Sequence, residues 1–480
     1  MNGIIYQNSV IEDNGTTYFL VKDEAGGAKY LAVKGDTNGF EGDFDENGIL
    51  HSPLTSSNAS NLRSRLPWLR PVSLGLDISF GFGDRLGLAT PGHIRAVRQT
   101  GIAPVFAQQS VRENLRTGRT PQEVLDDAMW GVFQEGWRGK WGADADHLKT
   151  PEDIKPFVRA GYTFFTIDPG DLVANISIEE TKTGLMTNTG RVPWESFVIT
   201  QNDLYKIYLN KTFHLEGFEL VYDEETLLRA LLKYGQAIAH TSLMYNQLLG
   251  LMGQKAFDLE LSLDETASPT SIYEHFFVAS ELARLGIKCI SLAPRYIGKF
   301  EKGVDYIGDS GEFESEIKLH AKVLRYFGNY KLSLHSGSDK FSIYPFISRH
   351  TRGKLHIKTA GTSYLEALRV VAEKDPAFFR EILAFSQEKY RTDRASYFVS
   401  AEIDKMAPPD GIKDSDLSSY LDQFDAREIL HVTFGSVLGK WGERLKSILR
   451  EHEEFYYSSL EKHFNRHLEP FHEMAVHTND

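Results

Sequence analysis

The chain has 480 residues, of which 41% are hydrophobic and 25% are charged, and its formal net charge at pH 7 is −13. This composition is typical of a soluble globular protein, and the acidic balance argues against nonspecific nucleic-acid binding, which needs a basic surface. No run of about 18 apolar residues occurs, so the sequence predicts no membrane span. The single cysteine, Cys289, excludes an intrachain disulfide, and a secretory signal pattern is absent; both features favour a cytoplasmic protein.

Residues 1–68 differ in character from the rest of the chain. Turn signals at Asp13-Asn14-Gly15 and Gly26-Gly27 separate β-prone runs such as residues 17–21. We therefore expect this N-terminal segment to form a small antiparallel, β-rich extension without a large core of its own.

From residue 69 to residue 375, short β-rich runs alternate with helical stretches. Three helices begin with Thr-Pro, at Thr90, Thr120 and Thr150, which places a good N-cap before a residue that fits the first helical turn. Several helices end at a glycine, which is a common C-terminal cap. The predicted strands are 73–80, 103–108, 140–146, 162–168, 257–263, 287–293, 330–335 and 354–359.

Eight strands that alternate with helices predict an α/β protein with a (β/α)8 TIM-like barrel. An open doubly wound sheet is the alternative, because periodicity alone does not show that a sheet closes. Residues 172–222 interrupt the alternation as a polar insertion, and a helix of roughly thirty residues follows near 224–253. Residues 376–480 are predicted to form a C-terminal helical region.

Polar side chains follow nearly every predicted strand. In a purely structural barrel the interior positions would be Val, Ile or Leu, and barrel active sites lie at the C-terminal ends of the strands. The convergence therefore favours an enzyme over a binding module. Asp146, Asp168 and Glu265 come from three different strands, and we predict that they act as acid and base groups.

Two histidines, His147 and His335, each end a predicted strand and are candidate metal ligands. Imidazole together with carboxylate is a common ligand set for Zn²⁺, Mn²⁺, Co²⁺ or Ni²⁺. The alternative is that each histidine caps its strand through a hydrogen bond. His356 is a third candidate ligand, although it lies mid-strand, where a hydrogen-bonded core histidine is the more common outcome.

Several cations and one amide are candidates to bind a substrate. Lys358 on the eighth strand suits either a Schiff base with a carbonyl or an anionic group of the substrate. We favour anion binding, because residues 359–362 open a helix whose N-terminal amides suit a carboxylate or a phosphate. The other candidate substrate-binding residues are Gln108, Lys149, Arg295 and Lys340.

Five longer stretches resemble one known family, the tagaturonate/fructuronate epimerases of bacterial hexuronate catabolism. They extend from the first predicted strand to the eighth, so the resemblance covers most of the chain. The matching stretches are 79–87 (SFGFGDRLG), 142–149 (GADADHLK), 300–309 (FEKGVDYIGD), 334–341 (LHSGSDKF) and 358–364 (KTAGTSY).

The resemblance implies a divalent metal and a small-molecule hexuronate substrate, with interconversion of D-tagaturonate and D-fructuronate and weaker action on tagatose and fructose. The inverted carbon lies β to the ketone, so removal of an α-proton does not reach it. Retro-aldol cleavage and re-addition to the other face is one route, in which the metal would stabilise an enediolate. A shift of the carbonyl by one carbon with two bases is the other. In both routes Asp146 and Glu265 are expected to transfer protons.

Two further functions remain open from the sequence. One is an aldolase-like lyase that uses Lys358 as a Schiff base, and the other is a sugar-acid binding protein without catalysis. The sequence has neither a DNA-binding motif nor a basic stripe, so nucleic acid and membrane are not expected as partners. Assembly into a homo-oligomer is left open.

Overall fold

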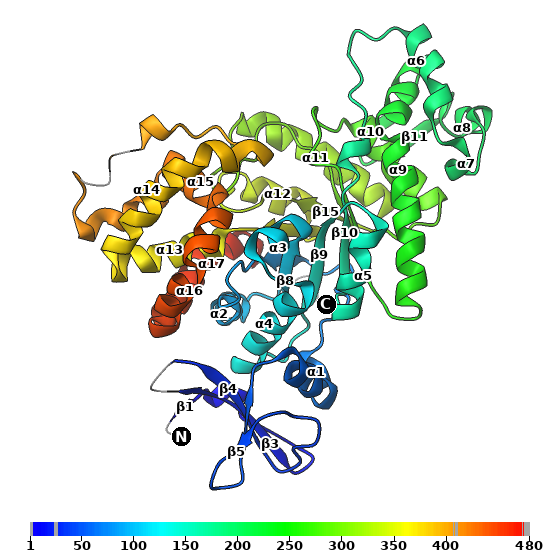
Figure 1. The fold of residues 1–480 in the computed structure, drawn as a ribbon. Coiled ribbons are helices and arrows are strands. Elements are labelled where there is room, and N and C mark those ends of the chain that lie inside the picture. Colours follow the sequence, from blue (N-terminus) through cyan, green and yellow to red (C-terminus); the bar gives the residue numbers. More distant parts are fainter. Residues whose placement is uncertain (1–2, 24–26, 407, 409–410, 473, 475–480) are drawn as a thin grey trace.

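A computed structural model describes residues 3–23, 27–406, 408, 411–472 and 474, and it confirms the predicted (β/α)8 barrel (Figure 1). Eight parallel strands close in the order β10-β13-β14-β15-β16-β7-β8-β9, which excludes an open sheet. The barrel strands are β7 (Ser79–Phe82), β8 (Ala103–Ser110), β9 (Gly142–Leu148), β10 (Phe164–Ile167), β13 (Asp258–Ser262), β14 (Ser291–Ala293), β15 (Lys331–Leu334) and β16 (Leu355–Thr359).

Helices surround the barrel, and several of their ends follow the sequence signals. Thr120 and Thr150 each form a capping box with an acidic residue three positions later. The helix near Thr90 differs, because it begins after Ala89 and takes Thr90 into its first turn. The barrel helices are α2 (Thr90–Val97), α3 (Val111–Thr117), α4 (Pro121–Gln134), α5 (Pro151–Ala160), α9 (Glu224–Met252), α10 (Ile272–Arg284), α11 (Ser310–Phe327), α12 (Tyr344–Thr351) and α13 (Thr362–Lys374).

The N-terminal extension is an antiparallel sheet in the order β1-β3-β4-β6-β5, with β2 paired to β3. Tyr18, Leu31 and Val33 of this sheet are buried in the same hydrophobic cluster as the barrel helices, so the extension shares the core of the barrel. The elements are β1 (Gly3–Ile5), β2 (Ile11–Asp13), β3 (Thr16–Asp23), β4 (Lys29–Lys34), β5 (Asp43–Phe44), β6 (Leu50–Pro53) and the following helix α1 (Ser56–Arg65).

The polar insertion after β10 folds into short helices and one hairpin beside the long helix α9. Phe197, Leu204 and Tyr208 of the insertion are buried in the main core cluster. Figure 1 shows this unit at the far end of the barrel from the N-terminal sheet. Its elements are α6 (Lys182–Asn188), α7 (Trp194–Phe197), α8 (Gln201–Tyr208), β11 (Thr212–Leu215) and β12 (Phe218–Val221).

The C-terminal region is helical, as the sequence predicts, and its last helix packs on α2 and α13. A Cβ added to Gly92 of α2 would lie 2.8 Å from the side chain of Leu460, so glycine permits the close approach of the two helices. Among the described residues, we find no helix with the length and apolar character needed to traverse a lipid bilayer. The helices are α14 (Pro376–Asp393), α15 (Phe424–Val432), α16 (Phe434–Glu451) and α17 (Glu453–Leu468).

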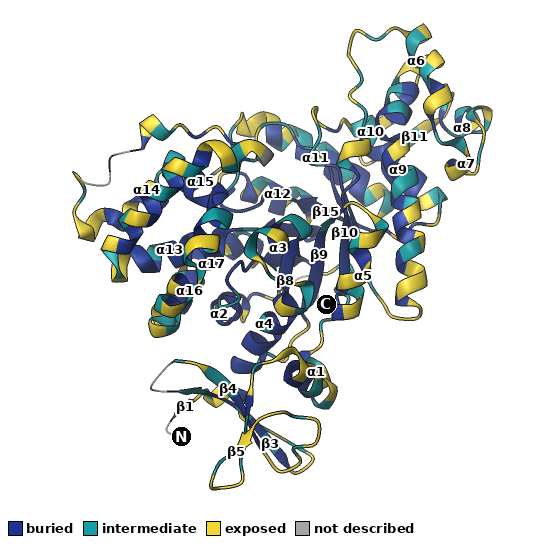
Figure 2. Ribbon diagram, viewed as in Figure 1, coloured by how far each residue is buried: buried dark blue, intermediate teal, exposed yellow. Residues whose placement is uncertain are grey.

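The barrel strands are buried (Figure 2), but many of their inward-facing side chains are polar. In its lower layer, Lys331 Nζ donates a hydrogen bond to Ser79 Oγ over 2.8 Å, and Ser79 Oγ lies 2.8 Å from His356 Nδ1. Asp258 accepts hydrogen bonds from the Ser73 hydroxyl and a backbone amide. Because barrel interiors are usually filled by branched aliphatic side chains, this polar interior points to a site above it.

Candidate active site

The centre of the site is the ammonium group of Lys358 on β16. Its Nζ lies 2.7 Å from Asp144 Oδ2, 2.8 Å from Asp146 Oδ1 and 2.8 Å from Glu260 Oε1. Burial alone would lower the pKa of Lys358, but the three carboxylates outweigh burial and raise it well above its usual value. An ammonium group held in this way has no lone pair with which to attack a carbonyl, which weighs against the Schiff base.

Asp144 and Glu260 are site residues that the sequence analysis missed. Burial raises the pKa of Asp144 to about 6, whereas Lys358 and His335 overcome the effect of burial and hold that of Glu260 well below its usual range. Successive strand residues face opposite sides, so Asp144 shares the inward face of β9 with Asp146. The alternation of acidic residues along β9 is therefore a sequence signal for Asp144, which a pattern of polar strand ends does not predict.

His147 reaches the mouth of the barrel through an unusual backbone conformation. In a regular strand its side chain would point away from that of Asp146, but its φ of 55° lies in the left-handed region. The pairing of β9 with β10 also shifts register beside it. Nδ1 of His147 consequently lies 2.9 Å from Asp146 Oδ1. Such strained conformations are concentrated at functional sites.

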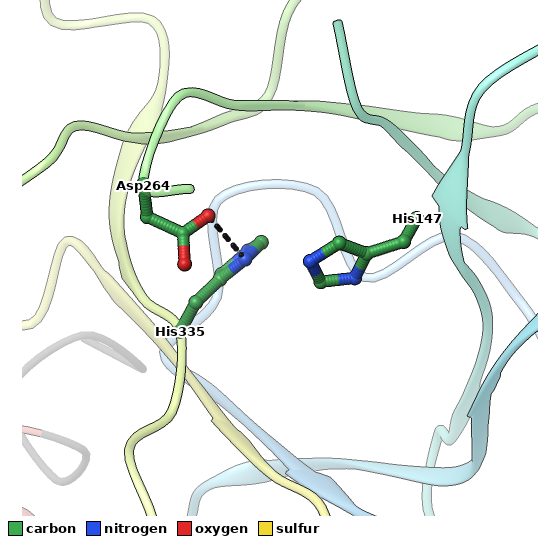
Figure 3. A group of neighbouring side chains, drawn as sticks. All are labelled: His147, Asp264 and His335. Carbon is green, nitrogen blue, oxygen red and sulfur yellow. Dashed lines mark ion pairs between the residues drawn. The ribbon is translucent and has the colours of Figure 1, made fainter. Parts of the chain in front are cut away.

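His147 and His335 approach each other across the mouth (Figure 3), with ring centroids 5.2 Å apart. His335 Nδ1 lies 3.0 Å from Asp264 Oδ1, and its Nε2 lies 2.5 Å from Glu260 Oε1. Burial would lower the pKa of both imidazoles, but the neighbouring carboxylates raise it to about 9 for His147 and to about 10 for His335. The carboxylates at the mouth therefore stabilise positive charge on the two imidazoles.

Two overlapping groups at the mouth have donors suited to a divalent metal. Their ligand atoms lie within 4.8 Å of one another in each group. Asp168 Oδ2 is buried and accepts no hydrogen bond from the described residues, so it retains a free lone pair. Imidazole nitrogens and carboxylate oxygens fit Zn²⁺, Mn²⁺, Co²⁺ or Ni²⁺. The groups are His147, Asp264 and His335, and His147, Asp168 and Glu265.

A third group of the same residue types, Asp339, His463 and His467, is occupied by internal bonds. Arg427 Nη2 lies 2.9 Å from Asp339 Oδ2, and His463 Nε2 lies 2.7 Å from Asp339 Oδ1. The Asp339 amide donates to His467 Nε2, which uses the lone pair that a metal would need. We interpret this group as an anchor that holds the loop after β15 to the C-terminal helices.

The three carboxylates predicted as acid and base groups all lie at the mouth. Asp146 is buried between Lys358 and His147, whereas Glu265 is partly exposed and its Oε1 lies 4.0 Å from His147 Nε2. Burial raises the pKa of Asp168, which follows β10. The structure therefore brings all three together around His147.

Two other predicted residues lie elsewhere. Lys340 is fully buried and donates to the carbonyl oxygens of Glu301, Val304 and Ser338, so it borders neither cavity described below. His356 belongs to the lower layer of the barrel and not to either metal-capable group at the mouth. His356 does not reach the mouth because it lies two residues before Lys358 on the same inward face of β16, one layer deeper in the barrel.

The remaining predicted substrate-binding residues are distributed around the mouth. Gln108 borders the inner cavity. Arg295 borders the outer cavity and donates a hydrogen bond to the Tyr296 carbonyl. Lys149 is half-exposed, and its Nζ lies 2.8 Å from Asp171 Oδ2. Two of the three therefore face a cavity.

Two adjacent cavities lie at the mouth. The inner cavity has a volume of about 30 Å³ and lies over Lys358 and His147. The outer cavity has a volume of about 680 Å³, and residues 397–400 of the C-terminal region form part of its wall. This volume is in the range of small-molecule sites. Residues that line both cavities are Lys302, His335 and Ser336.

Comparisons with known proteins identify the family and agree with the fold. The model of the family described as tagaturonate epimerase matches residues 6–471. The tagaturonate/fructuronate epimerase of Thermotoga maritima is 44% identical over 473 residues, which cover 97% of this chain and 96% of that protein. The native crystal structure of the fructuronate-tagaturonate epimerase from Cohnella laeviribosi is 36% identical, with a TM-score of 0.93 over 98% of this chain and 96% of that one. A glycerol-complexed structure of the same protein matches equally well.

Proposed function

Because this chain belongs to the tagaturonate epimerase family, we propose that it interconverts D-tagaturonate and D-fructuronate at the barrel mouth with the help of a divalent metal. The observation that carries the proposal is the convergence of two imidazoles and several carboxylates beside a cavity of about 680 Å³. These groups suit the reaction, because inversion of a carbon β to a ketone requires groups that transfer protons and stabilise negative charge.

A metal at this site would be held by His147 and His335, with oxygen ligands from Asp264 or Asp168, which leaves Glu265 outside the ligand set. When bound, it would supply Lewis-acid stabilisation of the negative charge that develops on the sugar oxygens. The residues below it fix the ligands: Glu260 orients His335 through Nε2, and Asp146 holds His147 through Nδ1.

The proton-transfer step is assigned to Glu265. In the retro-aldol route, the hydroxyl proton of the inverted carbon passes to a base while the adjacent C–C bond breaks, and the same proton returns when that bond re-forms on the other face. Glu265 borders the outer cavity, whereas Asp146 is engaged by Lys358 and His147. This route needs no oxidant or reductant, and the enclosed mouth would keep the two fragments together.

The function is tested by incubating the purified protein with D-tagaturonate and following the products by NMR. We expect D-fructuronate to accumulate to an equilibrium mixture. Dialysis against EDTA should abolish the conversion, and re-addition of Mn²⁺, Zn²⁺, Co²⁺ or Ni²⁺ should restore it. Full activity of a protein shown to be metal-free by mass spectrometry would contradict the metal requirement.

The same experiment separates the other functions. Release of two three-carbon fragments without epimer would identify a lyase. Binding of tagaturonate without any change in its stereochemistry would identify a sugar-acid binding protein. Either result would contradict the proposed epimerase.

A further inference from the structure

The proposed substrate is an anion, so the site needs a positive group to bind the substrate carboxylate. The identity of that group is inferred here on the basis of the proposed function. Most cations near the mouth are already engaged. Lys358 is bound by three carboxylates, and Lys149 contacts Asp171 at 2.8 Å. Lys340 is enclosed by backbone carbonyls. None of these three therefore offers its charge to a ligand without first losing a partner.

Lys302, on the loop between β14 and α11, is different. It lines both the inner and the outer cavity, and its Nζ donates a hydrogen bond to Ser336 Oγ over 2.5 Å. Among the described residues, no carboxylate lies within 4 Å of this ammonium group. Ser336 accepts the bond from Lys302, so its own hydroxyl hydrogen remains available for a second acceptor.

The loop that carries Lys302 is fixed on both sides. Glu301 accepts hydrogen bonds from the Ser400 amide at 2.8 Å and from the Ser400 hydroxyl at 2.6 Å. Lys340 Nζ donates to the carbonyls of Glu301 and Val304, and Arg427 Nε donates to that of Gly303 over 2.6 Å. The backbone around Lys302 is therefore held in place before a ligand arrives, which reduces the entropic cost of binding.

Further polar atoms beside Lys302 are available for a ligand. Ser338 Oγ and Gln108 Oε1 are buried at the inner cavity, and neither has a hydrogen-bond partner among the described residues. A buried polar atom without a partner is costly, so both atoms are available to a polar partner at the inner cavity. A serine hydroxyl can donate to a carboxylate, and the amide oxygen can accept from a sugar hydroxyl.

We propose that Lys302, together with the hydroxyls of Ser336 and Ser338, binds the carboxylate of the hexuronate and determines the preference for sugar acids over uncharged ketohexoses. The loop that bears Lys302 faces the loop after β15 that bears Ser336 and His335. Fixing the acid end of the substrate at this position leaves the remaining carbons to lie across the mouth toward the imidazoles.

The test compares Lys302→Met with the wild-type protein on D-tagaturonate and on the uncharged analogue D-tagatose. We expect kcat/KM for tagaturonate to fall roughly 10- to 100-fold, mainly through KM, because a charge-assisted hydrogen bond is lost. The value for tagatose should change by a much smaller factor, and Lys302→Arg should retain more of the preference for the acid. The matched control is Lys318→Met, an exposed lysine of α11 that borders neither cavity.

A binding measurement keeps the inference separate from the proposed activity. Calorimetry with D-galactonate and galactitol compares two open-chain ligands that differ in the carboxylate. Lys302→Met should weaken the binding of galactonate and leave the binding of galactitol unchanged. This result is expected even if the wild-type protein fails to epimerise tagaturonate. Equal losses for the charged and uncharged ligands would overturn the inference and make Lys302 a structural residue, and a loss confined to Arg295→Met would move the carboxylate to the outer cavity.

Discussion

The depth of a histidine along the barrel axis decides its chemistry. His335 follows β15 and contacts Glu260 and Asp264, both of which favour its charged form. His356 lies mid-strand in β16, where burial lowers its pKa well below the usual value and leaves a neutral ring beside Ser79. A divalent metal would replace the proton of His335, whose Nδ1 lies beside Asp264 at the mouth, whereas His356 belongs to neither group of ligand atoms there, so we assign only His335 to the metal.

This difference predicts the metal content of two variants. His335→Asn should lower the bound metal measured by inductively coupled plasma mass spectrometry, because one nitrogen donor is removed. His356→Asn, the matched control one layer deeper, should keep the wild-type stoichiometry, with circular dichroism as the check on folding. Unchanged metal in the first variant, or loss of metal in the second, would contradict the assignment.

At the scale of elements, the sequence predicted the existence of all eight barrel strands and the helical nature of the C-terminal region, but it placed the first strand at 73–80, whereas β7 begins only at Ser79. The Thr-Pro pairs near helix N-termini and the glycines at helix C-termini indicated where the helices lie between the strands, because capping is a local property of the chain. The left-handed conformation of His147 carried no such signal, since it depends on how β9 pairs with both neighbours. Asp144 and Glu260 lie inside β9 and β13, so a pattern of polar residues at strand ends does not predict them.

The loop after β15 depends on a glycine at its closest approach to β16. A Cβ added to Gly337 would lie 2.7 Å from Ile357 Cγ2 and 2.9 Å from the Lys358 carbonyl oxygen. Gly337→Ala should displace the loop that carries Ser336 and should lower the free energy of unfolding by about 1–3 kcal/mol, as overpacking does.

Urea denaturation and kcat/KM for tagaturonate measure this effect. Gly439→Ala is the control, because the added methyl group meets no atom within 4 Å and alanine favours the helix. A Gly337→Ala variant with wild-type stability and activity would show that the loop tolerates the displacement.

At the scale of the whole molecule, the C-terminal helices complete a site that the barrel begins. Arg427 of α15 and His463 of α17 bind Asp339, which fixes the loop after β15. Glu428 of α15 accepts hydrogen bonds from the amides of residues 400 and 401 beside the outer cavity. The sequence did not predict this role, because these contacts join residues that are far apart in the chain.

Glu428 should make the stability of the protein depend on pH. Burial and the neighbouring Glu301 raise its pKa to about 8, so the folded protein retains a proton that the unfolded chain loses near its ordinary pKa. This contribution to stability is fully present below the unfolded pKa and is lost as the pH rises toward about 8. Glu428→Gln should therefore reduce the fall in the free energy of unfolding between about pH 5 and pH 8.

Urea denaturation across this pH range checks the prediction. Glu443→Gln on α16 is the control, because the Glu443 side chain is exposed and should leave the slope unchanged. A Glu428→Gln variant with the wild-type pH dependence would assign the retained proton to another group.

The anchoring of Asp339 also has a consequence for biosynthesis. A ribosome adds residues from the N-terminus onward, so β16 leaves the exit tunnel before α15 and α17 have been made. The loop beside His335 then carries Asp339, a carboxylate whose cationic partners Arg427 and His463 do not yet exist. The nascent enzyme should therefore acquire its sugar-acid chemistry only when translation has passed His463, and a premature stop codon between the barrel and α17 should yield a protein with its strands but without its activity.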